Sequence, residues 1–185
     1  AVCLGTDAVL VVPGAVDNSV FSAEPEIVPY DVAYENARQM MQEMAAEMDA
    51  IAGVNLLVEN VWNKFLLSPL EFARFVDEIG HPQVGVYFDV GNILRTGFPE
   101  QWIRILGKRI KRVHFKDFRL AVDNVHGFVT LLEGDVNWPA VREALDEIDY
   151  NSWVAAEVLP AYRHYGAELA YELARKMDWI LGRSE

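Results

Sequence analysis

The sequence predicts an α/β protein built on a parallel sheet, and three observations lead to that fold class. Five short apolar runs alternate with longer amphipathic stretches along the chain. The runs are continuously apolar, which is typical of strands that are buried on both faces. Each run is followed by a helix-like stretch before the next run begins, and this order implies right-handed crossovers between parallel strands.

The five predicted strands are short runs rich in β-branched or aromatic residues. They are Ala8–Val12, Val54–Val58, Val84–Phe88, Ile110–Phe115 and Ser152–Ala156. Pro13 and Gly14 close the first strand, and residues 17–29 are expected to form a loop. A longer loop containing Gly127 and Gly134 is expected after the fourth strand.

Five predicted helices follow these strands. They cover Val32 to about Ala52, Pro69 to about Ile79, Phe98 to about Leu106, Asn137 to about Ile148, and Gly166 to Leu181. In the first helix, Ala and Met residues form one apolar stripe, Asp31 is the expected N-cap and Gly53 the expected stop. Ser68 before Pro69 has the pattern of an N-cap followed by proline at the first helical position.

Composition and charge limit the classes of partner. The chain has 185 residues, 52% of them apolar and 24% charged, so we expect residues 1–185 to form a single domain. Its net charge of −12 argues against a nucleic-acid partner. The single cysteine, Cys3, allows no internal disulfide and favours a reducing compartment. No apolar run approaches the ~18 residues of a membrane span, and no signal-peptide pattern is present, so we expect a cytoplasmic protein without a membrane partner.

Metal-competent residues stand at the ends of four successive strands. Glu59, Asp89 and Glu157 follow the second, third and fifth strands, and His114 lies near the end of the fourth. The carboxyl ends of parallel strands share one face, where α/β proteins bind ligands. Oxygen donors with one imidazole suit Mn²⁺, Mg²⁺, Co²⁺ or Zn²⁺, and three crowded carboxylates would repel one another without a cation. The alternative is that each acid is a helix cap or a solvated loop residue.

Several short runs give the chain a family resemblance. They are residues 57–63 (LVENVWN), 87–92 (YFDVGN), 113–117 (VHFKD), 133–138 (EGDVNW) and 156–158 (AEV). In order and spacing they resemble the xylose isomerase-like TIM barrel superfamily. Within it the chain is similar to the sugar phosphate isomerase/epimerase group, which contains ketose 3-epimerases and hexulose-phosphate isomerases.

The resemblance implies a (β/α)₈ barrel of which this chain holds only the C-terminal five βα units, about strands 4 to 8. A barrel needs roughly 250 residues, and the sequence starts without Met and runs at once into an apolar stretch. We therefore expect a truncated chain or a gap filled by a partner. An open sheet edge invites association, so we expect a homo-oligomer.

The resemblance also implies the chemistry. One divalent metal, Mn²⁺ foremost, would be held by Glu59, Asp89, His114 and Glu157. The two glutamates would act as catalytic acid and base on opposite faces of a sugar or sugar phosphate. One removes the proton next to the carbonyl, the metal stabilises the resulting enediolate, and the other returns a proton. The implied activity is that of a sugar isomerase or epimerase, of the 3-epimerase type.

Residues near these ligands are the expected substrate contacts. Asn92 stands where many relatives have a histidine, so it can bind a hydroxyl but cannot shuttle protons. This departure, with only four histidines in the chain, argues against the histidine-rich endonucleases of the same fold. The other candidates are Trp62, Lys116 and Arg119, with Arg163 and His164 as possible phosphate ligands. The alternatives are a packed tryptophan and solvated loop cations.

Two other functions stay open at this point. A dehydratase resembling inosose dehydratases would use the same α-proton removal but would expel hydroxide, so its product would lose the mass of water. A catalytically silent, ligand-binding member would keep the fold without turnover. If the purified protein holds no divalent metal and none changes its thermal stability, the site hypothesis fails.

Overall fold

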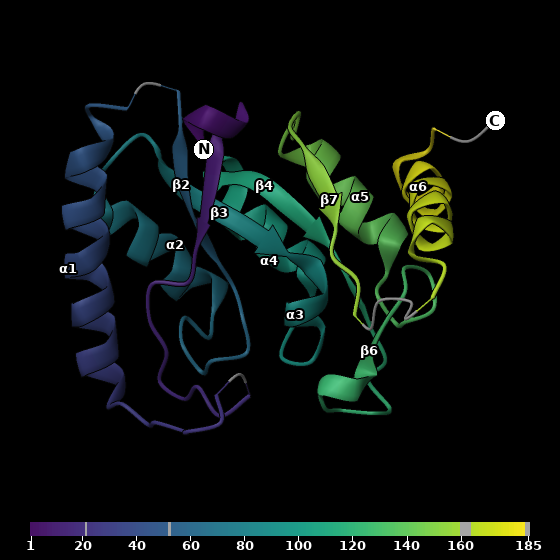
Figure 1. The fold of residues 1–185 in the computed structure, drawn as a ribbon, viewed down its shortest axis with the longest axis horizontal. Helices are drawn as coiled ribbons and strands as arrows, with labels where there is room; N and C mark the ends of the chain where they lie inside the picture. The colour runs from purple at the N-terminus through teal and green to yellow at the C-terminus, as the bar shows by residue number, and fades with distance from the viewer. Residues whose placement is uncertain (21, 52, 160–163, 184–185) are drawn as a thin grey trace. The chain divides into compact units, whose positions relative to one another are not determined.

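The computed structural model describes residues 1–20, 22–51, 53–159 and 164–183 (Figure 1). Its main sheet has five strands in the order β1-β2-β3-β4-β7. Their bounds are Ala8–Val11 (β1), Asn55–Glu59 (β2), Val84–Asp89 (β3), Ile110–Phe115 (β4) and Val154–Ala156 (β7). The pairs β1–β2, β2–β3 and β4–β7 are parallel. The predicted fold class is confirmed, since these are five successive βα units of a partial (β/α)₈ barrel.

The helices follow the strands in the predicted order, but the first helix ends at Met48 with Asp49 as its C-cap, so Gly53 is not the stop that the sequence predicted. Their bounds are Tyr30–Met48 (α1), Pro69–Ile79 (α2), Val90–Leu94 (α3), Pro99–Leu106 (α4), Trp138–Glu147 (α5) and Gly166–Leu181 (α6). Single 3₁₀ turns cover Val2–Leu4, Gly107–Arg109 and Val125–Gly127. Among the helices within the described ranges, none is long and apolar enough to cross a membrane.

The start of α1 corrects one sequence prediction. Asp31 is not the N-cap: α1 begins at Tyr30, its cap residue is Pro29, and Asp31 lies in the first turn. Proline at position 29 holds φ at −53° and needs no hydrogen-bond donor there. Asp31 still has a favourable position, because a carboxylate in the first turn interacts with the positive end of the helix dipole.

The starts of two other helices are as predicted. Ser68 caps α2, and its hydroxyl accepts a hydrogen bond from the Glu71 amide at 3.1 Å. Asn137 caps α5, and its side-chain oxygen accepts from the Ala140 amide at 3.3 Å. Both bonds satisfy amides in the first helical turn that have no partner within the helix.

The structure adds elements that the sequence did not predict. A five-residue helix, α3, follows β3 directly. The loop after β4 contains a two-stranded antiparallel sheet formed by Asp117–Phe118 (β5) and Phe128–Val129 (β6). Each added strand has two residues, which is too short for any periodicity to be visible in the sequence.

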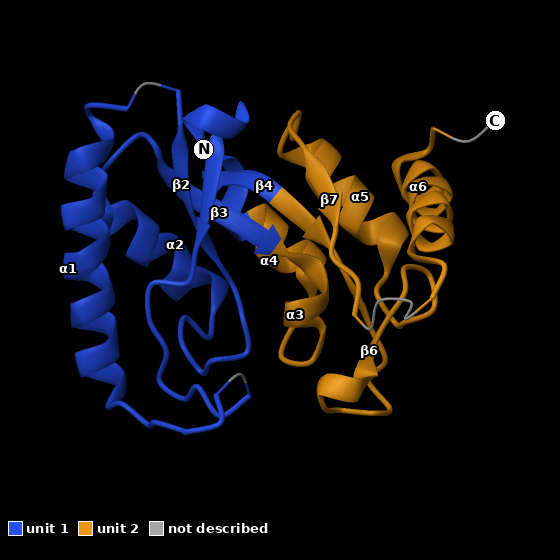
Figure 2. Ribbon diagram, viewed as in Figure 1, with its two compact units in different colours: residues 1–88, 105–112 blue, residues 89–104, 113–185 orange. Residues whose placement is uncertain are grey.

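The chain forms two compact units, coloured separately in Figure 2. Unit 1 contains Ala1–Phe88 and Ile105–Arg112. In this unit α1 packs beside α2. The buried face of α1 holds most of the predicted Ala and Met stripe, while Met40, also predicted to belong to it, is exposed. The rings of Phe65 and Phe75 meet edge to face with centroids 5.7 Å apart, and Tyr34 packs edge to face on Phe75 at 5.3 Å.

Unit 2 contains Asp89–Arg104 and Val113–Glu185. Its core is aromatic around the ends of β4 and β5: the ring centroids of Phe115 and Trp138 are 4.8 Å apart, and those of Phe118 and Phe128 are 5.1 Å apart. Phe115 and Phe118 are fully buried. Since β4 ends at Phe115, this packing fixes the backbone next to His114 and Lys116.

Candidate metal centre

Three of the predicted metal ligands meet within unit 2. Asp89 is the last residue of β3, His114 is the fifth residue of β4, and Glu157 directly follows β7. The parallel pairing of β4 with β7 places His114 opposite Ala155, and the Glu157 amide donates to the Phe115 carbonyl at 3.0 Å. The strand ends therefore bring these three side chains together, as the sequence predicts.

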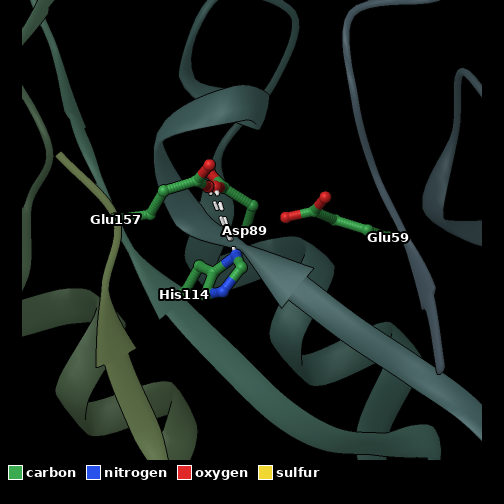
Figure 3. Close-up of side chains that lie close together, drawn as sticks. All are labelled: Glu59, Asp89, His114 and Glu157. Carbon is green, nitrogen blue, oxygen red and sulfur yellow. Dashed lines mark ion pairs between the residues drawn. The ribbon is translucent and has the colours of Figure 1, made fainter. Parts of the chain in front are cut away.

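The geometry of these three side chains suits shared coordination. His114 Nδ1 lies 3.3 Å from Glu157 Oε2 and 3.9 Å from Asp89 Oδ2. Figure 3 shows both carboxylates directed at the imidazole ring. The Asp89 side chain is fully buried, that of His114 is 15% exposed and that of Glu157 is 40% exposed. The cluster thus has one buried anchor and one side open to solvent.

Glu59 belongs to the same group of potential ligands. It is the last residue of β2. One ligand atom each from Glu59, Asp89, His114 and Glu157 lies within 4.8 Å of the other three (Figure 3). The group of potential ligands therefore consists of the four residues that the sequence singled out. Three carboxylates and one imidazole form a donor set that fits a divalent cation such as Mn²⁺, Mg²⁺, Co²⁺ or Zn²⁺.

Asp89 is fixed by the helix that follows it. Asp89 is the N-cap of α3, and its Oδ1 accepts a hydrogen bond from the Asn92 amide at 2.8 Å. This bond sets the rotation of the carboxylate. The other oxygen, Oδ2, lies at ion-pair distance from His114 and from Lys116 Nζ, 3.7 Å away.

A cation already lies beside the carboxylates. Lys116 Nζ donates to Glu157 Oε2 at 3.2 Å. The pKa of the Glu157 carboxyl is lowered to about 2, chiefly by a hydrogen bond from His114, with a further contribution from the charge of Lys116 and against the effect of burial. Glu157 is therefore a carboxylate at neutral pH, which is the form that binds a metal or accepts a proton.

Asp117 organises the loop around the cluster, and sequence reasoning did not single it out. It is fully buried. Its Oδ1 accepts from the amides of Phe118 (2.9 Å) and Val136 (3.2 Å), and its Oδ2 from the Leu132 amide (2.9 Å) and Trp138 Nε1 (3.1 Å). Burial raises the pKa of the Asp117 carboxyl, and these donors oppose that shift. The only sequence signal was its place in the run VHFKD.

A glycine makes room for this arrangement. A Cβ at Gly134 would lie 2.1 Å from Asp117 Oδ1. No side chain fits at that distance, so the EGD turn requires glycine for close approach to the buried carboxylate. The predicted loop glycine at position 134 therefore has a packing role.

The expected substrate contacts have different surroundings. Asn92 is 7% exposed, and Trp62 is half-buried. Arg119 is exposed and its Nε donates to the Glu133 carbonyl at 2.8 Å, within the same loop. His164 is exposed, and Arg163 lies outside the described residues. Contact of any of these side chains with a substrate stays a prediction.

Comparisons with solved structures agree with the fold. The chain is similar to L-ribulose 3-epimerase (17% identity, 97% of this chain, 63% of that chain, TM-score 0.75). It is also similar to the IOLI protein with a bound zinc atom (19% identity, 97% and 64% covered, TM-score 0.74). A third similar structure is the probable 3-DHS dehydratase AsbF from Bacillus anthracis (18% identity, 91% and 62% covered, TM-score 0.70).

These likenesses support the fold alone, since each identity is below 25%. The chain spans less than two thirds of the length of these three structures. No curated protein matches it. A family model, described as Xylose isomerase-like TIM barrel, matches residues 1–180. With its five βα units and with the cluster at their strand ends, the chain belongs to the xylose isomerase-like TIM barrel family.

Proposed function

We propose that this chain carries the metal centre of a sugar or sugar-phosphate isomerase or epimerase, of the 3-epimerase type, that moves a proton next to a carbonyl. The observation that carries the proposal is the group of Glu59, Asp89, His114 and Glu157, whose ligand atoms lie within 4.8 Å of one another. The similarity to L-ribulose 3-epimerase supports the substrate class. A sugar or sugar phosphate would be the small-molecule partner.

The four clustered residues would hold one divalent metal, for which we favour Mn²⁺ over Mg²⁺, Co²⁺ and Zn²⁺. A cation bound there supplies Lewis-acid stabilisation of the negative charge that develops on the substrate when the proton leaves. Asp89 is suited to be the permanent ligand, because it is fully buried and its second oxygen is fixed by the Asn92 amide.

Glu157 and Glu59 are the proposed proton carriers. Glu157 is 40% exposed, so a substrate can approach it from solvent. Its carboxyl is ionised at neutral pH, and the carboxylate is the form that can accept a proton. Glu59, from the end of β2, would exchange the second proton on the other face of the substrate.

Other parts of the proposal rest on the sequence. Asn92, Trp62 and Arg119 are the proposed substrate-binding residues, and the substrate contact expected of Lys116 stays a prediction. A single domain over residues 1–185, a homo-oligomer and a cytoplasmic location also stay predictions.

The proposal is tested by exchange of the α-proton in deuterated solvent. Ketoses and their phosphates are incubated with the protein and Mn²⁺, and incorporation of deuterium is followed by NMR. We expect exchange with at least one substrate. Glu157→Gln should lower its rate by about 10²- to 10⁴-fold, the usual contribution of a general base. Full exchange in this variant would show that Glu157 is not the general base.

A matched control separates this effect from a general loss of acidic charge. Glu133 lies in the same unit and pairs with Lys176 at 3.4 Å. Glu133→Gln removes one carboxylate without touching the cluster, so its exchange rate should equal that of the wild type.

A dehydratase is the second candidate, because one similar structure is the probable 3-DHS dehydratase AsbF. The same residues would remove the α-proton, and a hydroxyl group would then leave. Product mass separates the two functions, since an isomerisation conserves mass and a dehydration loses water. A silent ligand-binding protein would give neither product nor exchange.

A further inference from the structure

Lys116 is a buried cation within the carboxylate cluster. The residue is 5% exposed. Its Nζ lies 3.2 Å from Glu157 Oε2 and 3.7 Å from Asp89 Oδ2. The ammonium also lies 4.5 Å from the centre of the Phe128 ring, on its face. Two of the proposed metal ligands and one aromatic face thus surround the charge, and each of these contacts is favourable to a cation.

The position of Lys116 is held from both ends of the residue. At the backbone, α3 approaches so closely that a Cβ at Gly91 would lie 2.7 Å from the Lys116 carbonyl oxygen. At the side chain, Phe128 covers the ammonium, and Phe128 belongs to the small sheet β5–β6. The neighbouring residue Asp117 fixes that loop through four hydrogen bonds. Lys116 is therefore part of a rigid frame and is not a mobile surface lysine.

The charges of the site show what this lysine does. Glu59, Asp89 and Glu157 bring three negative charges, and Lys116 brings one positive charge. A divalent metal brings two more, so that the site with metal and lysine is neutral. With the metal bound but without Lys116, the site would have a net charge of −1. Because like charges at short range repel strongly in a partly buried site, the ammonium lowers the affinity of the cluster for a metal ion.

We propose that Lys116 is a built-in counter-ion of the metal centre. It orients the carboxylates of Glu157 and Asp89 before a metal arrives, and it keeps the affinity for a divalent cation low enough for the metal to exchange. This inference rests on the proposed metal site, and it makes Lys116 a positioning residue. It predicts an unusual pair of effects: removal of the lysine charge strengthens metal binding and weakens turnover.

The test is a Mn²⁺ binding isotherm, measured on the wild type and on two variants by the EPR signal of free Mn²⁺. Lys116→Met and Lys116→Gln remove the charge with side chains of different polarity. We expect both to bind Mn²⁺ about tenfold more tightly, from the loss of one neighbouring positive charge. In the exchange assay at saturating Mn²⁺, both should be slower, because Glu157 has lost its partner. Thermal unfolding shows which variants are folded.

Lys176 offers a matched control. Its side chain is 12% exposed and its Nζ pairs with two carboxylates, Glu172 at 2.5 Å and Glu133 at 3.4 Å. Lys176→Met therefore makes the same change of net charge in the same unit, at a lysine that pairs with different acids. Its affinity for Mn²⁺ should equal that of the wild type.

The outcomes distinguish this inference from the function on which it rests. If the wild type binds Mn²⁺ and neither Lys116 variant binds it more tightly, the counter-ion role is wrong while the metal site stands. Equal tightening in Lys176→Met would also refute it, because the effect would then follow the net charge alone. If the wild type binds no divalent metal, the proposed function and this inference are both wrong.

Discussion

Replacement of Asp117 by asparagine tests whether this buried carboxylate holds the loop next to the proposed metal centre. Each of its oxygens accepts two N–H groups at 2.9–3.2 Å. In the Asp117→Asn variant one oxygen becomes an NH₂ group, which cannot accept, so two buried donors lose their partner. A buried donor left without an acceptor costs about 1–3 kcal/mol. We therefore expect the free energy of unfolding to fall by about 3 kcal/mol.

Urea denaturation followed by tryptophan fluorescence measures this loss, and Trp138 is a direct reporter because its Nε1 donates to Asp117. Asp117→Ala removes all four acceptor contacts and should lower the free energy of unfolding further, to about 4 kcal/mol below that of the wild type. A decrease below about 1 kcal/mol for Asp117→Asn would refute the reasoning, since it would mean that water or a rearranged loop replaces the carboxylate.

An exposed aspartate in the same loop is the control. The Asp123 side chain is 64% exposed and pairs with Arg95 at 2.6 Å. Asp123→Asn removes one surface ion pair, which is worth about 0–1 kcal/mol. If both variants lost the same stability, the effect would reflect the loss of negative charge and not the burial of Asp117.

Two further predictions concern unit 1. Ser68→Ala removes the hydroxyl that caps α2 at the Glu71 amide, and it should lower the free energy of unfolding by about 1 kcal/mol in urea denaturation; an unchanged midpoint would show that Glu71 or water replaces the cap. The pKa of the Tyr34 hydroxyl is raised to about 12, mainly by burial and also by its hydrogen bond to the neighbouring Glu78. Because the folded protein favours the neutral phenol, its stability should decrease from about pH 10 to pH 12. Tyr34→Phe should weaken this decrease in pH-dependent thermal unfolding, and an identical profile would contradict it.

The strands and the four clustered residues could be predicted because both have local signals. Each strand is a short apolar run, and each acid stands at the point where such a run ends. A parallel sheet then brings residues from distant parts of the chain to one edge. Ser68 and Asn137 were predictable for the same reason, since a cap needs only its own helix turn. In contrast, the prediction of Asp31 as a cap was wrong because Pro29 takes that position.

The surroundings of the cluster depend on contacts that no local pattern shows. Lys116 was expected to reach substrate oxygens, and nothing in the run VHFKD shows that Phe128, from the far side of the same loop, would cover it. Phe128 belongs to the β5–β6 pairing, and Asp117, which is part of β5, accepts hydrogen bonds from the amides of Leu132 and Val136. These hydrogen bonds span 15 and 19 residues. The position of Lys116 after a histidine in the sequence therefore suggests a substrate contact, while the fold shows that its Nζ lies beside the carboxylates of Asp89 and Glu157.

Asp89 shows how a structural role and a proposed functional role can share one side chain. The sequence left two interpretations of an acid at a strand end, a helix cap and a metal ligand. In the structure Oδ1 caps α3 at the Asn92 amide, and Oδ2 lies 3.9 Å from His114 Nδ1 and 3.7 Å from Lys116 Nζ. The two roles depend on each other, because the cap fixes the carboxylate rotamer that presents Oδ2 to the cluster. A short helix directly after the strand thus orients the Asp89 side chain, since the Asn92 amide in its first turn holds Oδ1 and leaves Oδ2 facing His114 and Lys116.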